Sequence, residues 1–426
     1  MAANSSNRQR WLIWGGYAVV LLLAPLVFTS GLAVTMLSQI GIAIIACLAF
    51  NMLLGQGGML SFGHAVYSGL GSFFAIHTLN LVSKGSLSVP VSLIPLVAGV
   101  FGGLFAVLLG YVTTKKAGTP FAMITLGVGE LVWAMSLMFP GFFGGEGGIS
   151  GNRVAGPPAL GITFGPAVEL YYLIAVYCFI CTALMYAFTH TPLGRMLNAV
   201  RDNPERVEFI GYSTQRVRYF AFIASGFFMG ISGGLTALNF EIVTAEVVSA
   251  ARSGAFLLFT FLGGAMFFFG PIIGAVLMVL ALVLLSELTQ AWLLYLGLVF
   301  LFMVMYAPGG ISSLVMMNLR VASFGKLGRL TGVYLAFAVL TALIVAGAGA
   351  MIEMVYHLQL NEALGPQLKF MGIGLHAKSA ASWIGAAAVL AVGIAGFEFV
   401  RRRFAVIWGT IQSEIEAEVQ RREAAV

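Results

Sequence analysis

The sequence predicts an all-α polytopic integral membrane protein, on the strength of its low charge, its glycine content and its long apolar stretches. Only 9% of the 426 residues are charged, 60% are hydrophobic, and the mean hydropathy is +0.97. Since an average soluble chain is roughly 25% charged, a soluble protein of this length could not cover its surface with so little polarity. The 53 glycines agree with this class, because small residues let helices pack closely in lipid.

Twelve apolar segments follow one another along the chain, ten in a core and two in a C-terminal extension. A helix rises about 1.5 Å per residue, so about 20 residues cross the roughly 30 Å hydrocarbon core of a bilayer. Two of the segments, 64–80 and 271–287, are short, and each is expected to be either a full crossing or a re-entrant half-helix. The segments lie at 12–28, 32–54, 64–80, 91–114, 119–139, 167–189, 219–238, 254–270, 271–287, 291–306, 331–351 and 381–400.

The basic residues predict the orientation. If the N-terminus is cytoplasmic and the segments alternate, 17 of the 22 Lys and Arg residues fall on the cytoplasmic side. The positive-inside rule requires such a bias, so both termini are expected in the cytoplasm, and the net charge of +6 points to topology and not to nucleic acid. The first segment follows Arg8 and Arg10 as a secretory signal would, but its apolar run is longer than a usual signal core. We therefore interpret residues 1–31 as a cytoplasmic tail and an uncleaved anchor.

The chain after Arg320 is predicted to be an addition to the ten-segment core. It carries two further apolar segments and ends in the charged stretch SEIEAEVQRRE. Ser413 and Glu416 have the spacing of a capping box, a pair of side chains that satisfies free backbone N–H groups at a helix start. We therefore predict that a short, charged cytoplasmic helix begins there.

Residues 55–71, GQGGMLSFGHAVYSGLG, interrupt the apolar pattern with several glycines and polar side chains. Irregular backbone at membrane depth persists only where it is buried in protein or lines a cavity. The stretch is therefore either a broken element beside a translocation path, with Gln56, Ser61 and His64 on that path, or a tight helix crossing in which a neighbour satisfies His64. Glu130 lies in the middle of another segment and, as an intramembrane carboxyl, is a further candidate for the path. Three roles stay open for it: a pair with His64, contact with a substrate amine, or a structural anchor.

An internal stretch at 201–218, RDNPERVEFIGYSTQRVR, is unusually charged and lies between two apolar segments. The preceding span is expected to end at Pro192. Asn203 and Pro204 are typical of a helix start, and Gly211 is typical of the residue after a helix end. The pattern predicts a capped helix of about two turns, which is marginal by itself in water. Either a partner protein cradles this helix, or the stretch is a solvated loop that obeys the positive-inside rule.

Three motifs resemble one family of membrane proteins. The stretch TPLGRMLNAVRDNPERVEFIGYS is similar to the cytoplasmic coupling loop of ABC importer permeases, in particular the branched-chain amino-acid (LivM-like) type. NMLLGQGGMLSFGHAVYSGLGSF at 51–73 resembles an early glycine-rich signature of that family. FTFLGGAMFFFGPIIGAVL at 259–277, followed by YAPGGI at 306–311, resembles its last core helices. The matches span most of residues 32–311 in the right order.

The resemblance implies a permease core at 32–319, with a coupling loop at about 190–218 that meets an ATPase. The extension 320–426 lies outside the resemblance. Arg206 and Val207 stand where small alanines are usual, so the docking surface is expected to differ in detail. The residues implied to meet the ATPase are Gly194, Arg195, Arg201, Asp202, Asn203, Glu208 and Gly211.

The resemblance also implies the partners. No GxxxxGK[ST] phosphate-binding pattern occurs in the sequence, so ATP is expected on two separate cytoplasmic subunits, and this chain is expected to be neither an enzyme nor a holder of cofactor or metal. A second homologous permease and a periplasmic binding protein complete an importer of the bacterial inner membrane. The implied substrates are branched-chain or other hydrophobic amino acids, or related small amides and carboxylates.

Two other function classes compete with this one. An ion-coupled secondary transporter would need several intramembrane charges, and Glu130 is nearly alone. A membrane-embedded lipid-modifying enzyme would need clustered acids, bases or metal ligands.

The charged residues of two predicted outer loops are candidates for docking: Glu146 and Arg153 in one, and Glu241, Glu246 and Arg252 in the other. They are expected either to form salt bridges with a periplasmic binding protein or to be ordinary solvated charges. The glycines of SGFFMGISGG at 225–234 recur every fourth residue and predict a helix-packing face. The CxxC pair in the apolar run at 167–189 is predicted to be packing residues and not a redox or metal site.

Overall fold

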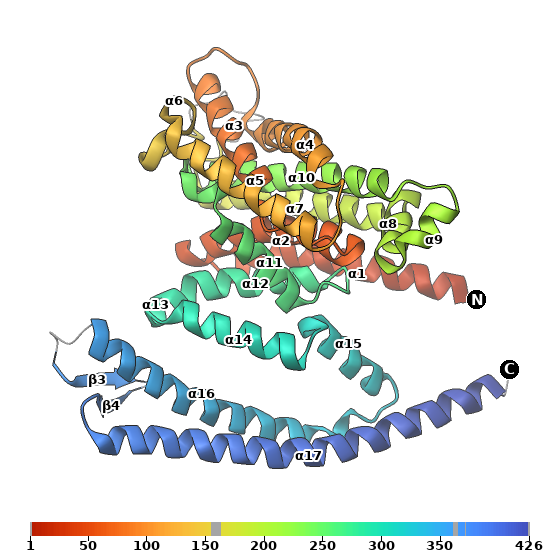
Figure 1. Ribbon diagram of the computed structural model, residues 1–426, viewed down its shortest axis with the longest axis vertical. Helices are drawn as coiled ribbons and strands as arrows, with labels where there is room; N and C mark the ends of the chain where they lie inside the picture. Colours follow the sequence, from red (N-terminus) through yellow and green to blue (C-terminus); the bar gives the residue numbers. More distant parts are fainter. Residues whose placement is uncertain (1, 155–162, 361–364, 371, 425–426) are drawn as a thin grey trace. The chain divides into compact units, whose positions relative to one another are not determined.

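The computed structural model describes residues 2–154, 163–360, 365–370 and 372–424. The chain forms two compact units, one made of Met1–Val283 with Phe302–Ser312 and the other of Leu284–Leu301 with Ser313–Val426. The described chain is almost entirely helical and contains only two short antiparallel strand pairs (Figure 1). The predicted all-α polytopic fold class is confirmed.

Nine helices in the described ranges are long and apolar enough to cross a membrane, and the bent pair α14–α15 makes up to ten. Helices of about this length cross the hydrocarbon core of a bilayer, and the helical hydrogen bonds satisfy the backbone groups inside it. The nine are α2 (Gly31–Gly57), α3 (Ala65–Ser83), α4 (Ile94–Thr113, after η1, Val91–Leu93), α5 (Thr119–Met138), α7 (Ala167–His190), α10 (Thr214–Phe240), α12 (Gly270–Leu280, continued by the π-helical η4, Ala281–Leu285, and α13, Ser286–Leu288), α16 (Thr331–Leu360) and α17 (Ala380–Ala424). The bent pair is α14 (Trp292–Tyr306) and α15 (Gly310–Ser323).

Each of the twelve predicted segments corresponds to one of these elements or to a shorter apolar helix. The shorter ones are Trp11–Val27 within α1 (Ala2–Val27) and α11 (Ala250–Gly263). Segments 64–80 and 271–287 both belong to helices of 19 residues, which are long enough for full crossings. The shortened element is instead α11, whose 14 residues reach only about 21 Å. The predicted segment 254–270 is therefore wrong at its end, because Gly264, with φ of 110°, terminates the helix.

Helix α10 lies at the centre of the first unit and packs against α2, α3 and α4. Gly230 faces α4 so closely that a Cβ atom there would lie 3.0 Å from the Cα of Gly102 and would also overlap the carbonyl oxygen of Ala98. On another face of α10, a Cβ on Gly233 would overlap the carbonyl oxygen of Ser68 in α3. The predicted glycine packing face is confirmed, and only residues without side chains allow this close approach.

One end of the first unit carries a two-stranded ribbon, and we call it the ribbon end. There β1 (Ile149–Ser150) pairs antiparallel with β2 (Ile242–Val243). Asn80, near the end of α3, donates from Nδ2 to the carbonyl of Ser150 at 3.0 Å. The same loops contain three short helical turns: α6 (Pro140–Phe143), η2 (Gly145–Gly147) and η3 (Ala245–Val248).

The opposite end of the first unit carries α8 (Pro192–Asp202) and α9 (Pro204–Phe209), and we call it the loop end. Helix α10 begins at Thr214, just after these two helices, and ends at Phe240, just before β2. Its 27 residues place the two ends about 40 Å apart along the helix axis. The segregation of the loops to two ends is visible in Figure 1.

The second unit is built around the antiparallel helices α16 and α17. Gly347 and Gly393 allow the close approach, since a Cβ on the first would lie 2.6 Å from the backbone nitrogen of Leu390. The loop between them carries β3 (Gln367–Phe370) paired with β4 (Ile373–His376). A 3₁₀ turn, η5 (Leu327–Arg329), leads into α16.

The predicted separate helix at the end of the extension is wrong. Helix α17 runs unbroken through 45 residues, about 67 Å, so Ser413 lies in its interior. The Ser413 hydroxyl donates to the carbonyl of Thr410 at 2.9 Å and caps nothing. The final turns instead pack an apolar stripe that includes Ile411 and Ile415 against Val321 of the same unit. This stripe makes continuation of the helix more favourable than a new start.

Candidate functional site

The charged loop of the sequence forms two helices and not one. Thr191 caps α8 by accepting a bond from the backbone nitrogen of Gly194 at 3.2 Å, and Pro192 occupies the first helical turn. The prediction that Pro192 ends the preceding span is therefore only half right, because α7 ends at His190 and Pro192 begins the next helix. A Cβ on Gly194 would overlap the carbonyl oxygen of Phe188, so the sharp turn between α7 and α8 requires glycine here.

Helix α9 has the caps that the sequence predicts. The side chain of Asn203 accepts a bond from the backbone nitrogen of Arg206 at 3.0 Å, and Pro204 is the first helical residue. At the other end, Gly211 has φ of 87°, and its nitrogen donates to the carbonyl of Glu208 at 2.9 Å. Asn203 also ends α8, so no spacer separates the two helices.

Two contacts hold α9 on the first unit. Val207 is buried, at 2% exposed, and the carboxylate of Glu208 accepts a bond from the Thr214 hydroxyl at 2.9 Å. Buried Arg218, one turn further along α10, also interacts electrostatically with Glu208. Helix α9 is thus fixed to the start of α10 on one side only.

The other side of α9 exposes large apolar side chains. Phe209 is 88% exposed, Ile210 is 66% exposed, and Tyr212 is 53% exposed. On a lipid-facing span such exposure is ordinary, but these residues lie at the end of the charged helix α9 and in the turn that follows it. An exposed apolar patch in a polar setting is typical of a protein-binding surface. Sequence reasoning missed these residues, although two adjacent apolar side chains in a charged loop were a readable signal.

Helix α8 docks on the glycine break at the end of α2. Arg201 donates from Nη1 to the carbonyl of Gly55 at 2.5 Å, and its Nε lies 2.9 Å from the carboxylate of Asp202. Gly58, with φ of 62°, lies so close that a Cβ there would be 2.9 Å from Cγ of Arg201. A Cβ on Gly57 would likewise approach Leu197 of α8 to 3.1 Å. Of the other predicted coupling residues, Arg195 and Asp202 are exposed on the surface.

The break itself lies at 58–64, between α2 and α3, and turns inward to His64. His64 is fully buried among the rings of Phe50, Tyr67 and Phe222, whose centroids lie 5.3 to 5.7 Å from its own. Its Nε2 lies 2.8 Å from the hydroxyl of Ser225. Since that hydroxyl donates to a backbone carbonyl, the imidazole nitrogen is the donor in this bond.

The break and the end of α2 before it contain buried polar atoms that lack partners. Within the described residues, four buried side-chain polar atoms have no hydrogen bond, and three of them lie at 51–64: Oδ1 of Asn51, Oγ of Ser61 and Nδ1 of His64. Such atoms are rare in well-packed proteins, and a cluster of them calls for water, a ligand or a second conformation. Among the described residues, most of the buried side-chain polar atoms that lack a hydrogen bond therefore lie at or beside the break.

Glu130 does not meet His64 in the first unit. Its neighbour Gly129 packs on the backbone of Gly63, but the Glu130 side chain is exposed on the outer face of α5. Only a third of the apolar window of α5 is buried, so the described residues of the first unit leave most of this helix uncovered. Of the other residues predicted to lie on the path, Gln56 is half-buried and Ser61 is fully buried.

The predicted outer charges divide into three kinds. Arg153 and Glu241 pair with each other, with a guanidinium–carboxylate distance of 3.7 Å and a backbone bond of 2.9 Å. Glu146 and Glu246 are exposed. Arg252 is not in a loop, because it lies in the first turn of α11 with its side chain turned toward the interior of the bundle. The expectation of a solvated or docking charge is wrong for Arg252.

The predicted packing role of the cysteines agrees with their surroundings. Cys47, Cys178 and Cys181 are buried free thiols. The sulfur of Cys178 lies 3.1 Å from the hydroxyl of Tyr17, which joins α1 to α7. Among the residues that the structure describes, no group of three or more His, Cys, Asp or Glu could hold a metal ion.

Comparison with known proteins gives a family. Residues 32–308 match the family model described as "Branched-chain amino acid transport system / permease component". The "High-affinity branched-chain amino acid transport system permease protein LivM" of Salmonella typhimurium strain LT2 is 25% identical over 345 residues, which cover 76% of this chain and 79% of the relative. The protein of the same description from Escherichia coli K12 is 25% identical over 314 residues, which cover 68% and 72%.

No solved structure gives a significant match to the chain. The family model nevertheless covers well over half of its length, including both the glycine break and the α8–α9 loop. The chain belongs to the family of permease components of branched-chain amino acid transport systems.

Proposed function

We propose that this chain is a permease subunit of an ATP-driven importer for branched-chain or other hydrophobic amino acids. The observation that carries the proposal is a continuous line of contacts. It runs from the exposed Phe209–Ile210 patch through α9 and α8 to Gly55 at the end of α2, beside the glycine break. ATP would bind to two separate cytoplasmic subunits, and this chain would supply only the path and the coupling.

The first step is docking of an ATP-binding subunit on α9. A helix of six residues is marginal by itself in water, so its apolar patch and its caps gain stability when a partner covers them. The exposed Glu205 and Arg206 surround this patch with charge and would set the register of the partner. Docking would therefore stabilise a helix that is already formed.

The second step is transmission of movement to the break. Because one residue, Asn203, joins α8 to α9, a push on α9 displaces α8 as well. Arg201 would then transmit the displacement to the carbonyl of Gly55, near the end of α2 and just before the glycine break. A change at 58–64 would let the unpartnered Ser61 and His64 find water or substrate, which is how we relate the break to the translocation path.

The third element is a second, homologous permease chain. We place it on the exposed face of α5, because this helix crosses the membrane with most of its surface uncovered and with a carboxyl at Glu130. An ionisable side chain is costly in contact with lipid and favours a protein or water environment. A path between the two chains would give Glu130 that environment.

The orientation follows from the basic residues. The loop end carries Lys115 and Lys116 together with the arginines of α8, α9 and the start of α10, whereas the ribbon end is poor in basic residues. We therefore place the loop end in the cytoplasm and the ribbon end outside, in the inner membrane of a bacterium, with both termini cytoplasmic. A periplasmic binding protein would deliver substrate to the ribbon end.

The test is a paired substitution in cells that express the whole transport system. Phe209→Ser with Ile210→Ser should abolish co-purification of the ATP-binding subunits in mild detergent and reduce leucine uptake to background. The matched control is Leu87→Ser, which removes a 40% exposed leucine from a loop near the ribbon end and should change neither measurement. Retention of the ATP-binding subunits by the double variant at the wild-type level would refute the docking role. Wild-type membranes that take up no amino acid under any condition would refute the transport role.

A further inference from the structure

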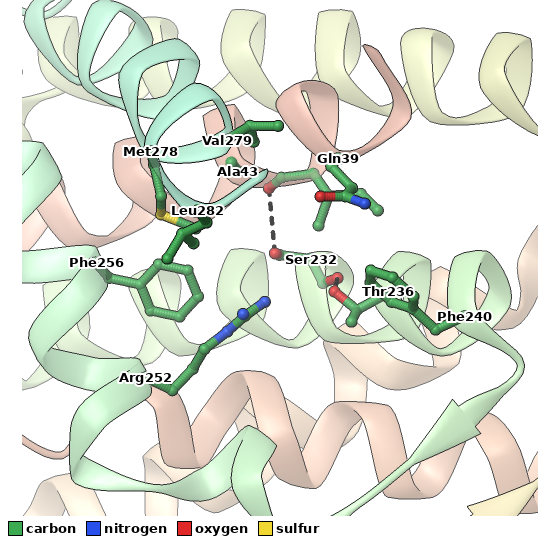
Figure 2. A pocket seen from close by; sticks show the side chains of 11 residues that line it. Gln39, Ala43, Ser232, Thr236, Phe240, Arg252, Phe256, Met278, Val279 and Leu282 are labelled. Carbon is green, nitrogen blue, oxygen red and sulfur yellow. Dashed lines mark hydrogen bonds between the residues drawn. The ribbon is translucent and has the colours of Figure 1, made fainter. Parts of the chain in front are cut away.

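A small pocket lies between α2, α10, α11 and α12, near the ribbon end of the first unit (Figure 2). Every helix that forms it belongs to the permease core matched by the family model. Polar side chains line one part of the pocket, and apolar side chains line the rest. The polar members are Gln39, Ser232, Thr236 and Arg252, and the apolar members are Ile42, Ala43, Phe240, Phe256, Met278, Val279 and Leu282.

Arg252 brings a positive charge into this pocket without a counter-ion. Within the described chain its guanidinium has no ion pair and no hydrogen bond, and its contact is with the ring of Phe256, whose centroid lies 5.4 Å away. The backbone nitrogen is satisfied separately by the Ser249 hydroxyl at 3.2 Å. A cation among apolar helices is costly unless an anion compensates it, and no carboxylate of the described residues does so. An anionic group bound in the pocket would therefore supply the counter-charge that Arg252 lacks.

The hydroxyl groups opposite Arg252 have the complementary chemistry. Ser232 donates its proton to the carbonyl of Ile42 at 3.2 Å, and Thr236 donates its proton to the carbonyl of Ser232 at 2.8 Å. With both protons committed to the backbone, the two oxygens offer only lone pairs to the pocket. They can accept hydrogen bonds from a cation or an amine. Gln39, with both a carbonyl and an amide, can contact either kind of group.

The rest of the wall is apolar. Phe256, Met278 and Val279 are each 2–3% exposed, so their side chains are fixed in place around the cavity. The cavity measures about 50 Å³, several times the roughly 10–15 Å³ that one water molecule needs. It accommodates a charged head group, and an attached aliphatic chain would extend toward the half-exposed Phe240 at the rim.

We propose that this pocket binds an aliphatic amino acid as a zwitterion. The carboxylate would pair with the guanidinium of Arg252, the ammonium group would donate to the oxygens of Ser232 and Thr236, and the side chain would extend toward Phe240 at the rim. This proposal rests on the proposed import function and adds to it a binding site within the permease itself. The site lies near the end at which we expect substrate to arrive. It would hold amino acids released from the binding protein before they pass inward.

The first test needs no substitution. The wild-type chain in lipid nanodiscs is titrated with L-leucine, with 3-methylbutylamine, which lacks the carboxylate, with 4-methylpentanoate, which lacks the ammonium group, and with inorganic phosphate. The shift in the thermal unfolding midpoint gives each apparent affinity, because a ligand of the native state stabilises it by mass action. Leucine should bind at least tenfold more tightly than each analogue. Equal shifts for leucine and phosphate would mean an unspecific anion site, and no shift with leucine would mean no amino-acid site. Either result overturns the proposal.

The second test assigns the partners. Arg252→Gln should weaken leucine at least tenfold but leave 3-methylbutylamine unchanged, whereas Thr236→Val should weaken leucine but leave 4-methylpentanoate unchanged. Lys84→Gln, an exposed charge removed near the same end, is the control and should alter neither affinity. An unchanged leucine affinity in Arg252→Gln would refute the site.

If cells with Arg252→Gln take up leucine with an unchanged KM, the pocket proposal fails and the import function stands. If wild-type cells show no uptake that depends on this chain, the import function itself fails.

Discussion

The ribbon end and the loop end of the first unit use arginine in opposite ways. At the ribbon end, the guanidinium of Arg153 donates to the carbonyls of Phe164, Leu238 and Gly165 at 2.8 to 3.2 Å, which joins loops to the end of α10. At the loop end, Arg201 makes one backbone bond, to Gly55 beside the glycine break. Several bonds to different segments fix a structure, whereas a single bond leaves the helix that makes it freer to move. From this comparison we infer that the ribbon end is a fixed frame, and our proposal is that movement enters at the loop end.

The largest expected effect is at the glycine that receives Arg201. A Cβ on Gly55 would overlap the carbonyl oxygen of Ala265, and backbone cannot move aside as a side chain can. Gly55→Ala should lower the free energy of unfolding by about 4 kcal/mol. Thermal unfolding of the purified chain and the folded yield on size exclusion measure this change.

Gly57→Ala is the matched control for Gly55→Ala. Its added Cβ would meet only the flexible tips of Leu197 and Met59, both at 3.1 Å. We expect a loss of about 1 kcal/mol in the free energy of unfolding. If the two variants unfold at the same temperature, the close packing that we describe at Gly55 is absent.

The next effect concerns the fixed frame. Arg153→Ala removes four hydrogen bonds from the guanidinium to backbone carbonyls and the charge that pairs with Glu241, which keeps only the bond from the backbone nitrogen of residue 153. The Arg153 side chain is only 14% exposed. The free energy of unfolding should fall by about 2–3 kcal/mol, since bonds to charged groups are strong and the freed carbonyls stay buried. Leucine uptake per folded molecule should remain at the wild-type value. A normal unfolding temperature in this variant would show that the ribbon end is not clamped.

Arg201→Gln should do the reverse of Arg153→Ala: it should lower leucine uptake and leave stability nearly unchanged. The side chain is about a third exposed and makes one backbone bond and one surface ion pair, so stability should change by less than about 1 kcal/mol. Leucine uptake should nevertheless fall about tenfold, because the displacement of α8 no longer reaches Gly55. Lys116→Gln, which removes an exposed cation of the loop end outside the coupling loop, should keep normal uptake. Equal uptake in the two variants would remove Arg201 from the coupling.

The smallest effect is expected at the cap that joins α8 to α9. Asn203→Ala loses the bond to the nitrogen of Arg206 and should cost about 1 kcal/mol, whereas Asn203→Asp keeps a cap. Since α9 must be helical to dock, affinity for the ATP-binding subunit should fall about fivefold in the first variant only. Titration of the purified subunits by surface plasmon resonance measures this difference. An equal loss in both variants would mean that the side chain contacts the partner and does not cap the helix.

The sequence predicted most of the helices, and the reasons lie in local chemistry. Apolar length locates a span, and the Asn203–Pro204 pair and Gly211 marked both ends of α9 because caps depend only on neighbouring residues. The same local rules misled at Ser413, where the capping pattern lies inside a continuous helix that tertiary packing extends. Pro192 was ambiguous for a similar reason, since proline is found both after a helix and in its first turn.

The site was less accessible to sequence reasoning than the fold. The apolar residues of α5 surround the helix, so no periodic pattern could show that Glu130 points away from His64. Arg252 precedes an apolar run, so the sequence predicts a charged residue in a loop. In the structure its side chain instead lines a pocket with residues of α2, α10 and α12, which are distant in the sequence. The contact between Arg201 and Gly55 joins residues 146 positions apart, which no local motif encodes.

One measurement tests the coupling directly. A photo-crosslinking residue, p-benzoylphenylalanine, replaces Phe209 in cells that express the whole system, and mass spectrometry identifies the product formed in intact membranes. Our account predicts a crosslink to an ATP-binding subunit, with a yield that changes when a non-hydrolysable ATP analogue is added to inverted vesicles. The same residue at Leu87 should give no such product. A crosslink from position 209 to a periplasmic protein, or labelling of this position by a reagent that cannot enter the cell, would contradict the account.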